Sequence, residues 1–63
     1  MIKCLIVDDE SVAQRIILSY LKDIPDTEVV GCAENAIDAM EILRTSLVNL
    51  MFLDIHLKLQ SQK

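Results

Sequence analysis

The sequence predicts an α/β domain in which a parallel sheet is built in the order strand, helix, strand, helix, strand. Two observations support this prediction. Short apolar runs alternate with two longer stretches whose apolar residues have helical spacing, which is typical of parallel sheets with crossover helices. In addition, the first and last apolar runs each end in aspartate, at Asp8-Asp9 and at Asp54, so acids are expected at one edge of the sheet.

The first strand is predicted over residues 2–7, with the sequence Ile-Lys-Cys-Leu-Ile-Val. Its residues are nearly all apolar and do not alternate with polar ones. Several are β-branched, and the run stops at acidic residues. These features are typical of a strand that is covered on both faces.

The first helix is predicted from about Ser11, and Ser11 or Asp9 is expected to cap its start. Pro25 is expected to end it, because the residue before a proline avoids helical angles. Its buried stripe follows spacings of three and four residues and comprises Ala13, Ile16, Ile17, Tyr20, Leu21 and Ile24. The residues assigned to the solvent face are Gln14, Arg15, Ser19, Lys22 and Asp23.

Residues 28–33 are predicted to form a second strand, and Gly31 within it favours a position at the sheet edge. Asn35 is expected to cap the second helix. The third strand is predicted over residues 50–53, which are wholly apolar. The predicted buried face of the second helix comprises Ala36, Ile37, Ala39, Met40, Ile42 and Leu43.

Two strand orders are compatible with this succession of elements. In the order 1-2-3 both helices would cover the same face of the sheet. In the order 2-1-3 the helices cover opposite faces, as the doubly apolar first strand requires. We therefore predict 2-1-3, which also places the first and third strands together at the switch point where ligands bind beyond the strand ends.

Composition and charge narrow the functional classes. The 63 residues are enough for at most one small domain, and 52% of them are apolar, as in a piece of a larger α/β domain. The net charge of −4 argues against nucleic acid as a partner of this segment. The sequence shows no membrane span and no secretion signal, so we expect a cytoplasmic protein without a membrane partner.

The two cysteines, Cys4 and Cys32, both lie in apolar runs. Their separation matches no metal-binding or redox motif. We therefore interpret both as reduced core thiols that serve as small apolar residues.

Asp8, Asp9 and Asp54 are the candidate functional residues. Carboxylates that converge at strand ends repel one another unless a cation joins them, and oxygen ligands suit Mg²⁺ or Mn²⁺. Asp54 stands alone at its strand end, so it is the better candidate for a nucleophile toward a phosphoryl group. The alternative is that the acids at positions 8–10 only favour the positive end of the helix that follows.

Four stretches resemble the N-terminal half of a bacterial two-component response-regulator receiver domain: Leu5-Ile6-Val7-Asp8-Asp9-Glu10, Gln14-Arg15, Ala33-Glu34-Asn35-Ala36 and Phe52-Leu53-Asp54-Ile55. The resemblance covers residues 1–57 and is closest to regulators with a LytTR-type DNA-binding domain. It implies a flavodoxin-like fold. It also implies that Asp54 is the phosphoacceptor and that Asp8, Asp9, Asp54 and the backbone carbonyl of His56 hold Mg²⁺. The implied partner is a sensor histidine kinase, which donates the phosphoryl group.

Other features depart from the receiver pattern. Receivers continue for two more strands and three more helices, and their Ser/Thr and Lys switch residues have no counterpart in these 63 residues. The Pro that often follows the phosphoacceptor loop is also absent, because Lys58 follows Leu57. We therefore expect residues 1–57 to be a truncated receiver domain and residues 58–63 a polar tail outside the family pattern. Such a fragment is expected to bind Mg²⁺ weakly and to be inactive in signalling.

Two further hypotheses stand beside this one. The third strand, residues 50–53, would be an exposed apolar edge. This favours a symmetric homodimer, either by pairing of the two third strands into a continuous sheet or by mutual exchange of elements. An enzyme of the haloacid-dehalogenase phosphatase type also uses an aspartate after a parallel strand. The nucleophile of that family stands in an Asp-x-Asp motif. In this chain the residue two positions after Asp54 is His56, so we expect the chain not to be an enzyme.

Overall fold

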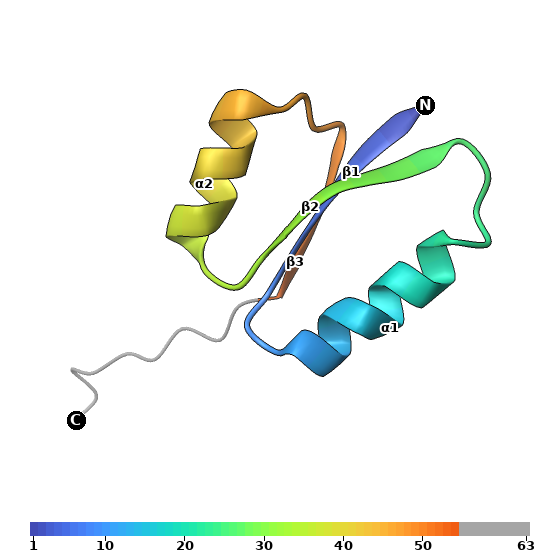
Figure 1. Cartoon of the computed structure of the whole chain (residues 1–63), viewed down its shortest axis with the longest axis horizontal. Coiled ribbons are helices and arrows are strands. Elements are labelled where there is room, and N and C mark those ends of the chain that lie inside the picture. The colour runs from blue at the N-terminus through green and yellow to red at the C-terminus, as the bar shows by residue number, and fades with distance from the viewer. Residues whose placement is uncertain (55–63) are drawn as a thin grey trace.

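The computed structural model describes residues 1–54. Its elements are, in order, β1 (Ile2–Asp8), α1 (Ser11–Leu21), β2 (Thr27–Ala33), α2 (Ala36–Thr45) and β3 (Leu50–Asp54) (Figure 1). The three strands form a parallel sheet in the order β2-β1-β3. The predicted fold class, element order and strand order 2-1-3 are confirmed, and the arrangement is that of a partial flavodoxin-like fold. The tail predicted at 58–63 lies outside the described residues.

The core consists of two clusters on opposite faces of β1. One cluster lies between the sheet and α2 and contains Leu5, Val7, Ala33 and Ala39. The other lies between the sheet and α1 and contains Cys4, Ile6 and Leu21. The four consecutive residues of β1 from Cys4 to Val7 have no exposed surface. The prediction that this strand is covered on both faces is therefore confirmed.

A β-bulge in β2 sets which of its residues face each helix. Cys4 is paired with Val29, but the next residue, Leu5, is paired with Gly31, so β2 has one extra residue here. Val29 packs in the cluster under α1, whereas Gly31 lies against α2. A Cβ atom at Gly31 would be 2.9 Å from Cδ1 of Ile42. The absence of a Cβ atom at Gly31 therefore lets the Ile42 side chain of α2 lie close to this outer strand without shifting.

The end of α1 differs from the prediction. The helix ends at Leu21 rather than at Pro25. The amides of Asp23 and Ile24 donate hydrogen bonds to the carbonyls of Tyr20 and Leu21, three residues back. These tighter bonds satisfy the last carbonyls and end the α-helix one turn before the proline.

The two helices begin in different ways. Ser11 is already the first helical residue of α1, so the capping position belongs to Glu10, which has no side-chain capping hydrogen bond within the described structure. The prediction that Ser11 or Asp9 caps α1 is wrong for that reason. In α2, by contrast, the side-chain oxygen of Asn35 accepts a hydrogen bond of 2.8 Å from the amide of Asp38, which confirms the predicted cap.

The buried face of α1 is narrower than predicted and is shifted around the helix. Ile17, Leu18 and Leu21 pack against the sheet, whereas Ile16 and Tyr20 are 50% and 68% exposed. In the described structure the helix backbone lies close to β1 and β2 but not to β3, and Phe52 is the β3 residue that packs against the cluster under the helix. Because the sheet ends one strand beyond β1, one flank of the apolar stripe has nothing to pack against.

The second helix repeats this pattern on the other face of the sheet. Ala39 is buried and Ile42 packs against it, but Ile37 and Met40 are 75% and 62% exposed. The predicted buried face was again too broad, because only the flank of α2 over β1 and β2 meets the sheet.

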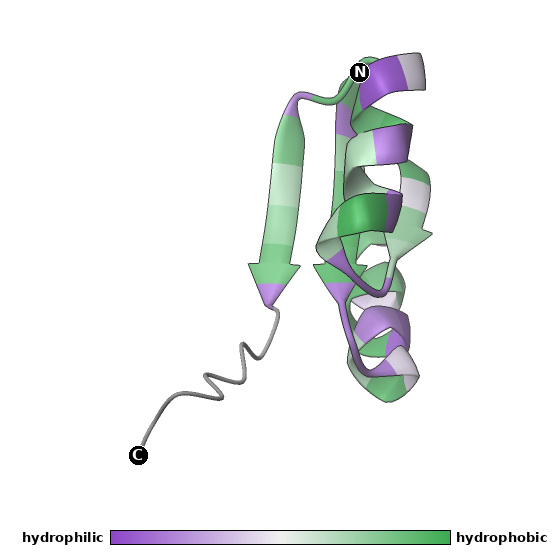
Figure 2. Ribbon diagram, turned by 90° about the vertical axis from the view of Figure 1, so that its left-hand side faces the viewer, coloured by the Kyte–Doolittle hydropathy of each residue, from purple (hydrophilic) through white to green (hydrophobic). Residues whose placement is uncertain are grey.

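β3 is an outer strand that neither helix covers, as Figure 2 shows. Leu50, Met51 and Leu53 are 45%, 42% and 62% exposed, and Phe52 is partly buried against the cluster under α1. The described structure thus contains an apolar edge strand with an open side, as expected from the sequence.

Candidate functional site at the carboxyl end of the sheet

The register of β1 and β3 brings two of the predicted site residues together. The two strands are paired in parallel from Cys4 opposite Leu50 to Asp8 opposite Asp54. Asp8 and Asp54 are therefore direct neighbours at the carboxyl ends of adjacent strands. This is the edge at which parallel α/β sheets bind ligands.

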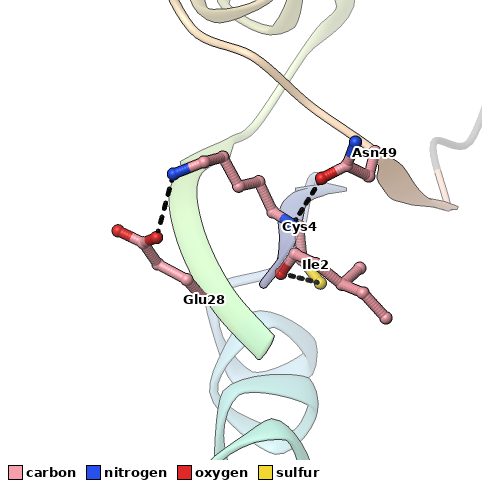
Figure 3. A network of polar contacts seen from close by, with 5 residues as sticks. Ile2, Cys4, Glu28 and Asn49 are labelled. Atoms are coloured by element: carbon pink, nitrogen blue, oxygen red, sulfur yellow. Dashed lines mark hydrogen bonds and ion pairs between the residues drawn. The ribbon is translucent and has the colours of Figure 1, made fainter. Parts of the chain in front are cut away.

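Asn49 sets this register from the opposite end of the strands (Figure 3). The amide of Lys3 donates to Oδ1 of Asn49 at 2.9 Å, a bond drawn in Figure 3. In return, the amide of Asn49 donates to the carbonyl of Lys3 at 2.8 Å. Lys3 also forms a salt bridge of 3.1 Å with Glu28 on β2. A shift of the β1–β3 pairing by one residue would turn every side chain of β3 to the other face. The two hydrogen bonds between Lys3 and Asn49 oppose such a shift and so help to hold Asp54 opposite Asp8.

Asp8 is held firmly within the fold. The residue is only 3% exposed, and a buried carboxylate is costly unless it has hydrogen-bond partners. Its Oδ1 accepts a hydrogen bond of 3.0 Å from the amide of Glu10. Its backbone carbonyl accepts a second bond of 2.8 Å from Nε2 of Gln14. The side chain and the main chain of Asp8 are thus fixed by different partners.

Asp9 and Asp54 are exposed, in contrast to Asp8. Among residues 1–54, no three histidine, cysteine or acidic side chains are grouped closely enough to hold one metal ion. The structure thus pairs Asp8 with Asp54 and leaves Asp9 beside them on the loop to α1. His56, whose carbonyl was the fourth predicted ligand, lies outside the described residues.

The pair of carboxylates is nevertheless a suitable donor set for a hard divalent cation. Mg²⁺ is usually bound through one or two carboxylates and completes its octahedron with water and phosphate oxygens. A buried carboxylate on one strand and an exposed one on the next match that requirement. The exposed side of Asp54 also leaves an approach for a phosphoryl group.

Gln14 lies at the site, although the sequence pattern places it on the solvent face of the first helix. In the structure it is half-buried, and its Nε2 also donates to the carbonyl of Ala33 at 3.2 Å. The available signal was spacing, since Gln14 precedes Ile17, Leu18 and Leu21 by three, four and seven residues. A polar residue on the sheet-facing stripe indicates a hydrogen-bonding role there.

Both cysteines are free thiols, and neither takes part in the acidic pair. Cys4 is buried, as predicted, but Cys32 is exposed, so its assignment to the core is wrong. It lies on β2, the outer strand, where the sheet has no further neighbour. Partial burial still raises the pKa of the Cys32 thiol above its ordinary value, which disfavours the reactive thiolate.

In the described part of the chain, neither helix combines the length and apolar character needed to cross a membrane. Comparison with family models and with solved structures gives no match. Curated relatives, however, match most of the chain at 32–40% identity.

Three relatives illustrate the range. The chain is 40% identical over 57 residues to an uncharacterized response regulatory protein of Shewanella oneidensis, which covers 90% of this chain and 24% of the relative. It is 37% identical over 57 residues to the transcriptional regulatory protein BtsR of Escherichia coli, covering 90% of this chain and 24% of BtsR. It is 39% identical over 56 residues to a protein-glutamate methylesterase/protein-glutamine glutaminase of Halalkalibacterium halodurans, covering 89% of this chain and 16% of that protein.

The chain therefore spans about a quarter or less of the curated relatives it matches. Regulators and a methylesterase share the matched segment, so the segment itself does not distinguish an enzyme from a regulator. Together with the strand order β2-β1-β3 and the acids at the ends of β1 and β3, these matches show that the chain is similar, over about nine tenths of its length, to response regulatory proteins and resembles the N-terminal half of a receiver domain.

Proposed function

We propose that these residues form the phosphoacceptor and cation-binding part of a receiver domain in two-component signalling. Asp54 is the phosphoacceptor. Mg²⁺ is held by the paired carboxylates of Asp8 and Asp54, and Asp9 and the backbone carbonyl of His56 join its shell when the ion binds. The observation that carries the proposal is the in-register pairing of Asp8 with Asp54 at the sheet edge. In the full-length protein, which we place in the cytoplasm, a sensor histidine kinase would donate the phosphoryl group.

The geometry supports a simple division of roles. A carboxylate oxygen of Asp54, which is exposed, attacks the phosphorus of a phosphohistidine. The phosphorus–nitrogen bond breaks, and the departing imidazole nitrogen takes up a proton. Mg²⁺ would supply positive charge that offsets the anionic donor and acceptor. Asp8 is buried and doubly fixed, so it contributes a carboxylate whose position is set before any ligand arrives.

Asp54→Asn is expected to weaken Mn²⁺ binding by tenfold or more. Loss of an outer-shell partner costs a metal site about 10- to 100-fold in affinity, and loss of a charged direct ligand should cost no less. Electron paramagnetic resonance of free Mn²⁺ would measure the affinity. Asp26→Asn is the matched control, because Asp26 precedes β2 at the other end of the strands and asparagine tolerates its positive φ of 65°. Equal affinities for wild type and Asp54→Asn would contradict the assignment.

The 63-residue polypeptide alone is expected to accumulate no stable aspartyl phosphate from acetyl phosphate and Mg²⁺. The Ser/Thr and Lys groups that bind the phosphoryl oxygens in the family are not among its residues, so transfer is slow and the product is not held. Intact-protein mass spectrometry tests this expectation. A phosphorylated species in the wild type that disappears in Asp54→Asn would confirm the phosphoacceptor and contradict the inactivity.

A second proposal concerns assembly, because β3 exposes apolar side chains along an open edge. The outer side of an edge strand offers backbone donors and acceptors that pair readily with another chain. We propose that the 63-residue polypeptide forms a symmetric homodimer in which the β3 strands meet. The net charge of −4 favours neither nucleic acid nor an anionic membrane surface as the alternative partner.

A further inference from the structure

Gln14 joins three elements at the acidic edge of the sheet. Its Nε2 atom donates to the carbonyl oxygen of Asp8 at 2.8 Å and to that of Ala33 at 3.2 Å. A side-chain amide nitrogen carries two hydrogens, so each carbonyl receives its own donor. One side chain on α1 is thereby tied to the ends of both β1 and β2.

The two carbonyls lie where β1 and β2 begin to separate. Val7 and Ala33 are the last paired residues of β1 and β2. The carbonyl of Asp8 therefore lies beyond the β1–β2 ladder, although Asp8 still pairs with Asp54 of β3. A buried backbone carbonyl requires a hydrogen-bond partner. Gln14 supplies that partner from outside the sheet at the point where the ladder ends.

The carbonyl of Asp8 belongs to the peptide unit that connects Asp8 to Asp9. Because a peptide unit is planar, a hydrogen bond that fixes this carbonyl also fixes the direction of the Asp9 amide. The carboxylate of Asp8 is held separately by the amide of Glu10 at 3.0 Å. The backbone between the two adjacent acids is therefore fixed by Gln14, while one of their carboxylates is fixed by the loop.

We infer that Gln14 is a positioning residue for the acidic site, which sets the relative orientation of Asp8 and Asp9 through the peptide unit between them. This inference rests on the proposed function in so far as it concerns cation binding. Groups that orient metal ligands from outside typically change metal affinity by about 10- to 100-fold when removed. Gln14 bonds to the backbone carbonyl of Asp8 and not to its carboxylate, whose partner is the amide of Glu10, so its effect on a cation is transmitted through Asp8.

The test replaces Gln14 with methionine, which has a similar length and no donor. Gln14→Met is expected to weaken Mn²⁺ binding about tenfold and to shift the ¹⁵N resonance of the Asp9 amide in metal-free protein. Gln14→Arg restores donors, so it should return the Asp9 resonance toward its wild-type position. The matched control is Ser19→Ala, which removes a bond of 2.7 Å to the carbonyl of Ile16 on the exposed face of α1 and should change neither quantity.

The outcomes separate this inference from the proposed function. If wild type binds Mn²⁺ and Gln14→Met binds it equally well, the inference is wrong and the cation site stands. If wild type binds no Mn²⁺, the proposed function fails, and an Asp9 resonance unchanged in Gln14→Met overturns the inference as well. If Gln14→Met does not fold, the side-chain amide protons of Gln14 in wild type decide. Slow exchange with solvent supports the inference, and exchange at the rate of a free amide overturns it.

Discussion

Leu5→Ala is expected to leave the 63-residue chain largely unfolded at room temperature. Leu5 is fully buried in the central strand, in the cluster under α2. A Leu→Ala change in such a place costs about 2–5 kcal/mol, as lost transfer free energy plus the cavity that remains. A single core in a chain of this size supplies about 3–5 kcal/mol in total, so the loss is comparable to the whole stability.

Urea denaturation followed by far-ultraviolet circular dichroism would measure this loss. The matched control is Leu47→Ala, the same chemical change at a residue that is 67% exposed between α2 and β3. It should alter the free energy of unfolding by about 0.5 kcal/mol or less. A Leu5→Ala chain with the wild-type urea midpoint would show that the β1 core described above is not what stabilises the fold.

Lysine at two positions of β3 is expected to convert the homodimer into a monomer. Met51 and Leu53 are 42% and 62% exposed and pair with Leu5 and Val7, so they face the α2 side of the sheet. Lysines on an edge strand block pairing with another chain, because the charges of two copies would be brought together. Met51→Lys with Leu53→Lys should therefore sediment as a monomer at concentrations where the wild type is a dimer.

Ile37→Lys is the control for added charge, because Ile37 is 75% exposed on α2 and lies away from the strand edge. It should remain dimeric. A wild-type chain that sediments as a folded monomer at all concentrations would contradict the β3 proposal. If the dimer also stabilises the fold, the thermal midpoint of the wild type should rise with protein concentration.

The sequence was sufficient to predict the sheet and the position of the acid pair. The uninterrupted apolar run from Cys4 to Val7 required cover on both faces, and only the strand order 2-1-3 supplies it. Once β1 and β3 are neighbours, the aspartates that end them must be close, which the register of Asp8 with Asp54 confirms. These inferences succeeded because they depend on hydrophobic burial and chain direction, which a local pattern records well.

Other features depended on contacts between distant parts of the chain. The apolar stripe of α1 indicates which residues are able to face a core, but not that Tyr20 lies beyond the part of the sheet that α1 covers. Likewise, the role of Gln14 depends on where the carbonyl of Ala33 ends up, nineteen residues away. The bulge in β2 has only Gly31 as a local sign, and Ile42, which lies against Gly31, comes from a different element, α2.

If the register of β1 and β3 builds a cation site from Asp8 and Asp54, residue-specific nuclear magnetic resonance during a Mn²⁺ titration will locate the ion at that end of the sheet. Paramagnetic Mn²⁺ broadens the signals of the nuclei nearest to it. At substoichiometric Mn²⁺ the amide signals of Asp8, Asp9 and Asp54 should disappear first, while those of Asp23 and Asp26, acids near the opposite end of the sheet, remain sharp. Broadening that is equal at Asp26 and Asp54, or that is absent from Asp8, would contradict the site.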